Sequence, residues 1–253
     1  MSRTRRFYDE LAEDYHLIYA DWEASIGRQA AALDGLIGPA RRRVLDCACG
    51  IGTQAIGLAG RGHTVIGTDL SPVAAARAAT EATRRGLTVP VAAADMRALP
   101  FPDATFDVAI CADNALPHFL TPQDMHAGLT GIRRVLADGG LLITSTRPYD
   151  ELREQRPGYS PPWKSTTPTG RSISFQLWDW HPDGERYDLE HFTLVPDGEG
   201  WRVAVRRATY WAITRRELAT LVAAAGFTDV TWHEPEDCGF FQPVLTAIAK
   251  IAV

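Results

Sequence analysis

The chain has 253 residues, of which 45% are hydrophobic and 23% charged, and a formal net charge of −5, which is the composition of a folded α/β domain. A weakly acidic chain offers no basic surface for nucleic acid, and no apolar run reaches the length of a membrane span, so we expect neither partner. The four cysteines are too few for a disulfide framework and lack the paired spacing of a zinc site, so we expect free thiols, no metal and a cytoplasmic location.

The N-terminal stretch carries aromatic and aliphatic residues at steps of three and four from Tyr8 to Trp22. This spacing predicts a helix with a break near residues 20–21, and the charged sequence around it argues against a signal peptide. Residues 26–37 predict a second helix that ends at Gly38. Core packing accounts for the apolar stripe, whereas tyrosine hydroxyls suit a half-wet cleft. The tyrosines concerned are Tyr8, Tyr15 and Tyr19.

From residue 41 onward, apolar strands alternate with helical patterns, and the links between them are short. This alternation predicts an α/β fold with a doubly wound, Rossmann-like sheet of mostly parallel strands. Two strands near the C-terminus bring the expected total to seven, and an antiparallel insertion follows the fifth. The expected sheet strands are residues 44–46, 64–68, 89–94, 106–111, 141–145, 227–233 and 244–251, and those of the insertion are 173–177, 187–195 and 201–211.

The first of these strands runs into a loop of small residues, 46–52 (Asp-Cys-Ala-Cys-Gly-Ile-Gly). A dinucleotide-binding fingerprint needs a third glycine at a spacing that this loop lacks. Residues this small let a ligand lie directly on the backbone. The segment resembles motif I of the class I S-adenosylmethionine-dependent methyltransferases, with Ala48 in place of the first glycine. The resemblance implies that Asp46 faces the methionyl ammonium. It also implies that the nucleoside lies across Gly50 and Gly52.

Asp69 ends the second predicted strand. A carboxylate there can accept both ribose hydroxyls, although an acid also suits the start of the helix that follows. By the same resemblance, Asp95 meets the adenine amino group and Met96 stacks on the ring, with a turn acid and a core methionine as the alternatives. The resemblance covers residues 44–146. We place two further residues at the same cofactor site, Leu70 and Cys111.

A narrower resemblance comes from residues 111–118 and 146–150, together with residues 8–28. These segments are similar to the glycine and sarcosine N-methyltransferases. The likeness implies that Arg147 binds the acceptor carboxylate and that Asn114 lines the acceptor pocket. The remaining contacts that we infer are Arg28, Tyr8 and Tyr15 with the cofactor and Tyr149 with the acceptor.

The chain departs from that family at Pro148, at Asp113 and over residues 155–163. The acceptor is therefore expected to be larger or differently charged than glycine. The role of Arg147 as an acceptor-binding residue is also supported without the likeness. Arg147 lies at the carboxyl end of a central strand, and open α/β sheets bind ligands at that end of their strands. A guanidinium there can hold a carboxylate with two parallel hydrogen bonds. An ion pair with Asp150 is the alternative.

The expected reaction is in-line transfer of a methyl group from S-adenosylmethionine to a small-molecule acceptor, with alignment as the main source of rate. A desolvated pocket favours the neutral form of an amine, so a dedicated base is optional for an amine and more necessary for a hydroxyl. The candidate bases are His118, His191 and Asp113, and the further catalytic candidates are Asn114 and Tyr19.

We therefore expect one methyltransferase domain with four parts. The favoured acceptor is the amine of an amino acid or a similar carboxylate-bearing amine. The alternatives are an O- or C-methyltransferase that tailors a natural product, a non-catalytic S-adenosylmethionine-binding protein and, more distantly, a nicotinamide dehydrogenase. Homo-oligomerisation stays open. The expected parts are an N-terminal helical lid (1–40), a cofactor-binding core (41–147), an antiparallel substrate cover (148–212) and a C-terminal helix with the last two strands (213–253).

Overall fold

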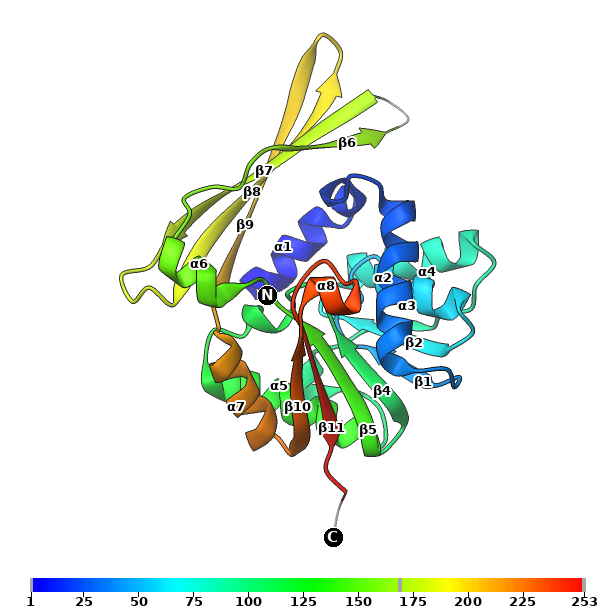
Figure 1. The fold of residues 1–253 in the computed structure, drawn as a ribbon. Coiled ribbons are helices and arrows are strands. Elements are labelled where there is room, and N and C mark those ends of the chain that lie inside the picture. The colour runs from blue at the N-terminus through cyan, green and yellow to red at the C-terminus, as the bar shows by residue number, and fades with distance from the viewer. Residues whose placement is uncertain (1, 168–169, 252–253) are drawn as a thin grey trace.

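The computed structural model describes residues 2–167 and 170–251 and contains two sheets (Figure 1). The larger sheet has seven strands in the order β10-β11-β5-β4-β1-β2-β3. Among the described strands of this sheet, β11 is the one that runs against the others. The predicted doubly wound, mostly parallel sheet is therefore confirmed. Its strands are β1 (Arg43–Asp46), β2 (Thr64–Asp69), β3 (Val91–Ala93), β4 (Phe106–Cys111), β5 (Leu136–Ser145), β10 (Phe227–His233) and β11 (Val244–Ala249).

The direction in which the chain adds strands reverses beside β1. The chain moves outward from β1 through β2 to β3, then returns to the other side of β1 with β4 and β5. The loops that leave β1 and β4 therefore diverge, and open α/β sheets bind ligands in the crevice between such loops. Val44 pairs with Val65 and Val108 in this centre, and all three are buried, as expected for a parallel sheet covered on both faces.

Helices cover both faces of this sheet. Their apolar side chains form two cores, one on each face. Among the described residues, no helix is both long and apolar enough to cross a membrane. The helices of one face are α2 (Trp22–Ile37), α3 (Thr53–Gly60) and α4 (Pro72–Arg84), and those of the other are α5 (Pro122–Val135) and α7 (Arg215–Ala224). Short helical turns follow three strands, η2 (Met96–Ala98) after β3, η3 (Leu116–His118) after β4 and α8 (Pro235–Cys238) after β10.

The N-terminal segment forms two short helices, α1 and η1, where the sequence predicts one. The chain leaves its helical path near Asp14, whose carboxylate pairs with Arg206 at 2.6 Å. Asp21 then accepts a hydrogen bond from the Ala24 amide (2.9 Å) and caps α2, which begins earlier than the spacing predicts. The predicted break at residues 20–21 is confirmed, whereas the earlier break depends on a partner distant in sequence. The bounds are α1 (Arg3–Leu11) and η1 (Tyr15–Ile18).

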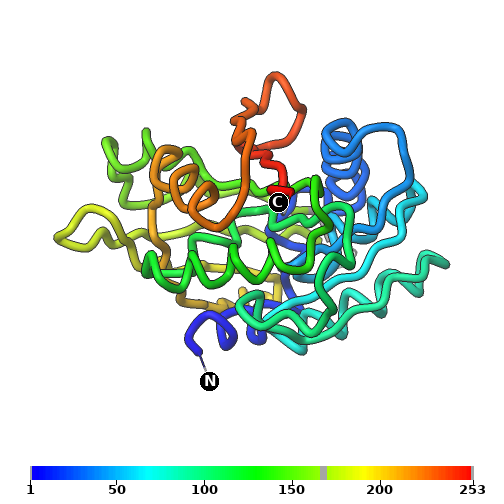
Figure 2. Tube along the Cα trace, turned by 90° about the horizontal axis from the view of Figure 1, so that it is seen from below, coloured from blue at the N-terminus to red at the C-terminus, as the bar shows by residue number. Residues whose placement is uncertain are grey.

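The second sheet, β6-β7-β8-β9, is antiparallel and lies over α1 and η1 (Figure 1). Helix α6 and strand β6 form over residues 149–167, where the sequence predicts neither a helix nor a strand, and β6 pairs with β7 from Trp163 onward. We call this sheet the cover. Its turn between β7 and β8 projects from the side of the molecule opposite α2 (Figures 1 and 2). The bounds are α6 (Tyr149–Gln155), β6 (Trp163–Thr167), β7 (Gly170–Trp180), β8 (Arg186–Asp197) and β9 (Gly200–Trp211).

Candidate functional site

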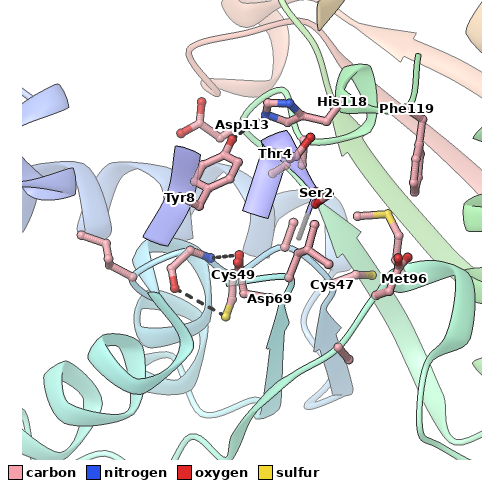
Figure 3. Close-up of a pocket in the computed structure, with 18 of the residues that line it drawn as sticks. Ser2, Thr4, Tyr8, Cys47, Cys49, Asp69, Met96, Asp113, His118 and Phe119 are labelled. Carbon is pink, nitrogen blue, oxygen red and sulfur yellow. Dashed lines mark hydrogen bonds between the residues drawn. The ribbon is translucent and has the colours of Figure 1, made fainter. Parts of the chain in front are cut away.

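A cavity of about 330 Å³ lies at the carboxyl ends of β1, β2 and β4, beneath α1 (Figure 3). We call it the first cavity. The loop after β1 lines one side, and tyrosines of the N-terminal segment line the other. In Figure 3, Asp69 lies opposite Tyr8, while Met96 and Phe119 lie together at one end. The cavity is thus at the place predicted from the strand ends.

The two glycines of the loop after β1 have different structural roles. Gly50 lines the first cavity with a φ of 53°, and a Cβ there would lie 2.9 Å from the Tyr15 ring. Gly52 lies off the cavity wall, contrary to expectation. Its φ is 94°, and a Cβ there would lie 2.9 Å from Ile56 and 3.3 Å from Ala78, so its small size serves the packing of α3 on α4. Of the two, Gly50 lines the first cavity, and its lack of a Cβ lets the Tyr15 ring lie close to the backbone there.

Asp69 lines the first cavity at the end of β2. Its two carboxylate oxygens accept hydrogen bonds from the amides of Gly50 and Ser71, each at 2.8 Å. These bonds fix the plane of the carboxylate and leave further lone pairs for hydroxyl donors. Burial raises the pKa of Asp69 to about 6, although the two amide bonds favour the ionised form.

Asp46 lies at the end of β1, is 1% exposed and lies off the wall of the first cavity. Its Oδ2 has no hydrogen-bond partner among the described residues. Burial, followed by the charge of Asp69, raises the pKa of Asp46 to about 7. A buried carboxylate oxygen without a donor is stabilised by a nearby cation, so this group suits an ammonium held directly or through water.

The other end of the first cavity is formed by η2 and α5. Asp95 lines it and accepts hydrogen bonds from the Arg97 guanidinium, the shortest at 2.6 Å, while Arg97 also reaches Asp124 at 2.6 Å. Met96 lines the wall beside them. A Cβ on Gly131 of α5 would overlap the Met96 carbonyl oxygen, so the glycine allows η2 to pack closely. Because η2 is held in place by α5, the Met96 side chain has a fixed position on the cavity wall, where a flat aromatic ring could stack on it.

These residues fit the S-adenosylmethionine that the resemblance implies. The backbone at Gly50 is open to a ligand, Asp69 offers a carboxylate between the two ends, and Asp46 has an oxygen without a donor nearby. Two expected residues lie elsewhere. Arg28 is exposed on α2, where it donates to Ser25 at 2.9 Å. Cys111 is fully buried inside β4, and Ala112 lines the wall of the first cavity in its place. The other expected wall residues do line the first cavity: Ala48, Leu70, Tyr8, Tyr15, Tyr19 and His118.

A smaller cavity of about 80 Å³ lies between the N-terminal helices and the cover. We call it the second cavity. Tyr8, Tyr15 and Asp113 line both cavities and so form the boundary between them. Asn114 and Arg147, which the sequence assigns to the acceptor, line only the second cavity. A group held here faces the first cavity across one layer of side chains.

The guanidinium of Arg147 is enclosed by the cover. It donates to the Tyr187 hydroxyl at 2.9 Å and to Gln176 Oε1 at 3.2 Å, and it lies 4.9 Å from the centroid of the Trp178 ring and 5.5 Å from that of Tyr210. Among the described residues, no carboxylate forms an ion pair with it, so the alternative pairing with a neighbouring acid does not occur. The charges of Arg147 and Asp113 influence each other without an ion pair between them, so this half-buried guanidinium keeps N–H groups that an anionic ligand would satisfy.

Two residues in the loop after β4 have an unusual backbone conformation. Asp113 and Asn114 have φ values of 56° and 64°, a left-handed conformation that non-glycine residues seldom adopt. The Asn114 side-chain amide Nδ2 is buried and has no partner among the described residues. Asp113 accepts a hydrogen bond from the Tyr19 hydroxyl at 3.1 Å. Burial raises the pKa of Asp113, while Tyr19 and Arg147 lower it.

Both candidate histidines have a lowered pKa; His191 is buried and His118 is partly buried. His118 Nε2 lies 2.8 Å from the Tyr8 hydroxyl, and burial, followed by the charge of Arg147, lowers the pKa of His118 to about 3. Burial and Arg206 lower the pKa of His191 to about 4. His191 lines the second cavity, and its Nε2 has no partner among the described residues. Neither ring can hold a proton readily near neutral pH.

Several residues behind the second cavity position the others. Tyr149 lies off both cavity walls, and its hydroxyl lies 3.0 Å from that of Tyr187, which contacts Arg147. Gln176 and Tyr210 line the second cavity, and sequence analysis does not assign them to it. Strand alternation could place both on one face of the cover, but only the fold shows that this face meets Arg147.

The chain matches the model of a methyltransferase domain over residues 44–140. It is 36% identical over 140 residues to a demethylmenaquinone methyltransferase from Thermus thermophilus, a match that covers 54% of this chain and 62% of that protein. It is 36% identical over 114 residues to a glycine/sarcosine N-methyltransferase from Parasynechococcus marenigrum, covering 45% and 40%. The chain thus spans less than two thirds of the length of these curated relatives.

Solved structures resemble the chain over nearly its whole length. The CcbJ methyltransferase from Streptomyces caelestis has a TM-score of 0.79 at 20% identity, with 99% of this chain and 100% of that chain covered. CalS10, described as an amino pentose methyltransferase from Micromonospora echinaspora with bound S-adenosylmethionine, has a TM-score of 0.73 at 23% identity, with 94% and 95% covered. At these identities the likeness establishes the fold.

Proposed function

Because residues 44–140 form a class I S-adenosylmethionine-dependent methyltransferase domain, we propose that the whole protein transfers a methyl group from S-adenosylmethionine to the amine of a small molecule that carries a carboxylate. The observation that carries the acceptor class is the half-buried Arg147 guanidinium, which forms no ion pair with a described carboxylate. The relatives add support for an amine, since one is named a glycine/sarcosine N-methyltransferase and one structural neighbour an amino pentose methyltransferase.

S-adenosylmethionine supplies a methyl group on a positively charged sulfur, which needs no further activation. In our proposal Asp69 accepts hydrogen bonds from the ribose hydroxyls, and Met96 contacts the adenine beside Asp95. Tyr8 and Tyr15 cover the ligand from α1 and η1 and exclude water. The boundary that these tyrosines share with Asp113 is where the methyl group and the acceptor would meet.

The acceptor would lie in the second cavity with its carboxylate on Arg147. The stacked faces of Trp178 and Tyr210 restrict the guanidinium, so it can present its free N–H groups in a fixed direction. The free Nδ2 of Asn114 offers a further donor to a carboxylate or hydroxyl oxygen. A pocket richer in donors than in acceptors favours an oxygen-rich ligand. The acceptor amine would then point toward Asp113.

The amine must lose a proton before it can attack. We assign that proton to Asp113, because burial raises its pKa above that of an ordinary carboxylate and so improves it as a base. The low pKa values of His118 and His191 make either ring a poor proton store. His118 instead accepts or donates the hydrogen bond that fixes the Tyr8 hydroxyl at 2.8 Å. Alignment of amine and methyl group would supply most of the rate.

We also propose that the protein works in the cytoplasm on a small molecule. All four cysteines carry free thiols, and three of them are buried, as suits a reducing compartment. The net charge of −5 supports a small-molecule acceptor over nucleic acid.

The test is methyl transfer from labelled S-adenosylmethionine to a panel of amino acids, amino sugars and carboxylate-free amines, read by mass spectrometry. Arg147→Ala should raise the acceptor KM by about 30- to 100-fold, the loss expected for a charged hydrogen-bonded pair, and leave the KM of S-adenosylmethionine within about twofold. Arg153→Ala is the control, since Arg153 pairs with Glu217 outside both cavities. Equal transfer to amines with and without a carboxylate would overturn the acceptor class.

A further inference from the structure

The outer face of the cover has the opposite polarity to that expected of an exposed sheet. Along β7, the polar residues Ser172 and Ser174 are buried, whereas Ile173, Phe175 and Leu177 are partly or largely exposed. An antiparallel sheet with one wet face normally turns its apolar residues toward the protein. The reversed pattern indicates that another apolar surface covers the outer face.

The partly and fully exposed apolar residues form one area across three strands, which the Glu190–Arg207 ion pair borders beside Leu177. Ile173 pairs with Leu194, which pairs with Val203 on β9. In the next row, Phe175 pairs with Phe192, and their rings stack with centroids 4.7 Å apart. We call this area the outer patch. Its members are Tyr159, Ile173, Phe175, Leu177, Phe192, Leu194, Trp201, Val203 and Val205.

We propose that the outer patch binds the same patch of a second copy of this chain, so that two covers pack face to face around a two-fold axis. A two-fold interface must be complementary to itself, because the same residues supply both sides. The charges of the outer patch meet this requirement, and its size suits a protein–protein interface.

The charges at the two ends of the patch are opposite. Arg171 and Lys164 are exposed at one end, and Asp179 is exposed at the other. None of the three forms an ion pair with another described residue. Phe175 lies midway between Arg171 and Asp179 along β7. A two-fold axis at Phe175 with antiparallel β7 strands therefore places Arg171 of one copy over Asp179 of the other.

A like-charge pair inside the cover points the same way. Asp179 of β7 lies directly opposite Asp188 of β8, an arrangement that destabilises a sheet. Arg3 and His181 contact Asp188, but Asp179 has no such partner among the described residues. A cation from a second copy would neutralise it. This requirement favours a partner with a basic end over a purely apolar partner.

The size of the outer patch is close to that of a specific interface. Nine residues of β7 span about 30 Å, and three strands with their side chains span about 15 Å. The flat area is therefore roughly 450 Å² per copy, and corrugated side chains present a larger accessible surface. Specific interfaces bury about 800 Å² per partner, so the dimer is expected at the weaker end of that class.

Sedimentation velocity from about 1 to 100 μM protein tests the proposal at the concentrations where such an interface dissociates. The unchanged chain should pass from a 27.8 kDa monomer to a dimer as concentration rises. Leu177→Lys/Val203→Lys should raise the dissociation constant by about 30-fold or more, because both side chains are exposed on the outer patch and the dimer would bury each new charge against apolar or basic residues of the other copy. Val73→Lys is the matched control, since Val73 is equally exposed on α4.

A charge exchange tests the two-fold arrangement itself. Arg171→Asp should weaken the dimer, and Arg171→Asp/Asp179→Arg should restore it, because both ends are reversed in both copies. Circular dichroism on each variant separates loss of contact from loss of fold. A monomer at every concentration would overturn the proposal, as would a dimer that the Leu177→Lys/Val203→Lys change leaves intact. Binding of the monomer to phosphatidylglycerol vesicles would assign the patch to a membrane instead.

Discussion

The first cavity and the second cavity are built in different ways. One wall of the first takes its polar groups from the ends of strands, where the amides of Gly50 and Ser71 hold Asp69, and the N-terminal tyrosines form the opposite wall. The second combines Arg147 with residues of the cover, and it leaves hydrogen-bonding atoms of Asn114 and His191 without described partners. The first is therefore determined locally, whereas the second depends on the cover and on its ligand.

The largest expected effect tests the local cavity. Asp69→Ala should raise the Kd of S-adenosylhomocysteine by about 10²- to 10³-fold, because two hydrogen bonds to a charged acceptor contribute roughly 1.5 kcal/mol or more each. Calorimetric titration measures it. Asp107→Ala is the control, since Asp107 binds Arg43 at the opposite end of β4. A folded Asp69→Ala protein that binds like the unchanged chain would remove this cavity from the cofactor site.

The second prediction concerns the charge buried beside the first cavity. The pKa of Asp46 is about 7 in the folded protein against 3.8 in its ordinary state. Between those values the folded chain holds a proton that the unfolded chain releases, so its contribution to stability falls as pH rises from about 4 to 7. Asp46→Asn should therefore stabilise the ligand-free protein at pH 8, on the order of 2–4 kcal/mol, and change it little at pH 4.

Urea unfolding of both proteins at the two pH values measures this difference. A stability change that is the same at pH 4 and pH 8 would contradict the assignment. The variant should also bind S-adenosylmethionine more weakly, since the neutral amide no longer attracts an ammonium.

A third prediction separates packing at the cavity from helix propensity. Gly131→Ala should destabilise the protein by about 1–3 kcal/mol, because the added methyl group overlaps the Met96 carbonyl oxygen. Gly27→Ala on α2 meets nothing within 4 Å and should stabilise it by up to about 1 kcal/mol. Thermal unfolding of the two variants gives the comparison. Equal effects would show that α5 does not fix η2.

The smallest expected effect lies at the boundary of the cavities. Tyr19→Phe removes the hydrogen bond that lowers the pKa of Asp113, so that pKa should rise. If the ionised carboxylate takes the proton of the amine, the acid limb of kcat/KM should move to higher pH. The rate above that limb should fall about 3- to 10-fold, the cost of one hydrogen bond. An unmoved acid limb would exclude Asp113 as the titrating group.

Sequence reasoning recovers much of the first cavity and less of the second. Gly50, Asp69 and Met96 line the first cavity because each lies at the carboxyl end of a strand or within about four residues of it, and strand ends can be read from the sequence. Gly52 and Cys111 follow the same rule but face the packed core, and a periodic pattern does not distinguish the two sides of a loop. The likeness to the N-methyltransferases predicts that Arg28 contacts the cofactor, but Arg28 is exposed on α2 and lies off the wall of the first cavity.

The sequence by itself determined the mostly parallel, doubly wound sheet, the small-residue loop and the acids at or just after the ends of β1, β2 and β3, because these depend on local spacing and on short βαβ connections. Only the tertiary structure decided that the Arg147 guanidinium lies against the Trp178 and Tyr210 rings, that Tyr8 meets His118, and that the cover turns apolar residues outward. These facts join segments from about 30 to more than 100 residues apart, in places where alternation alone fits either face of a strand. The physical reason is that register and side are set by packing, which the whole chain determines together.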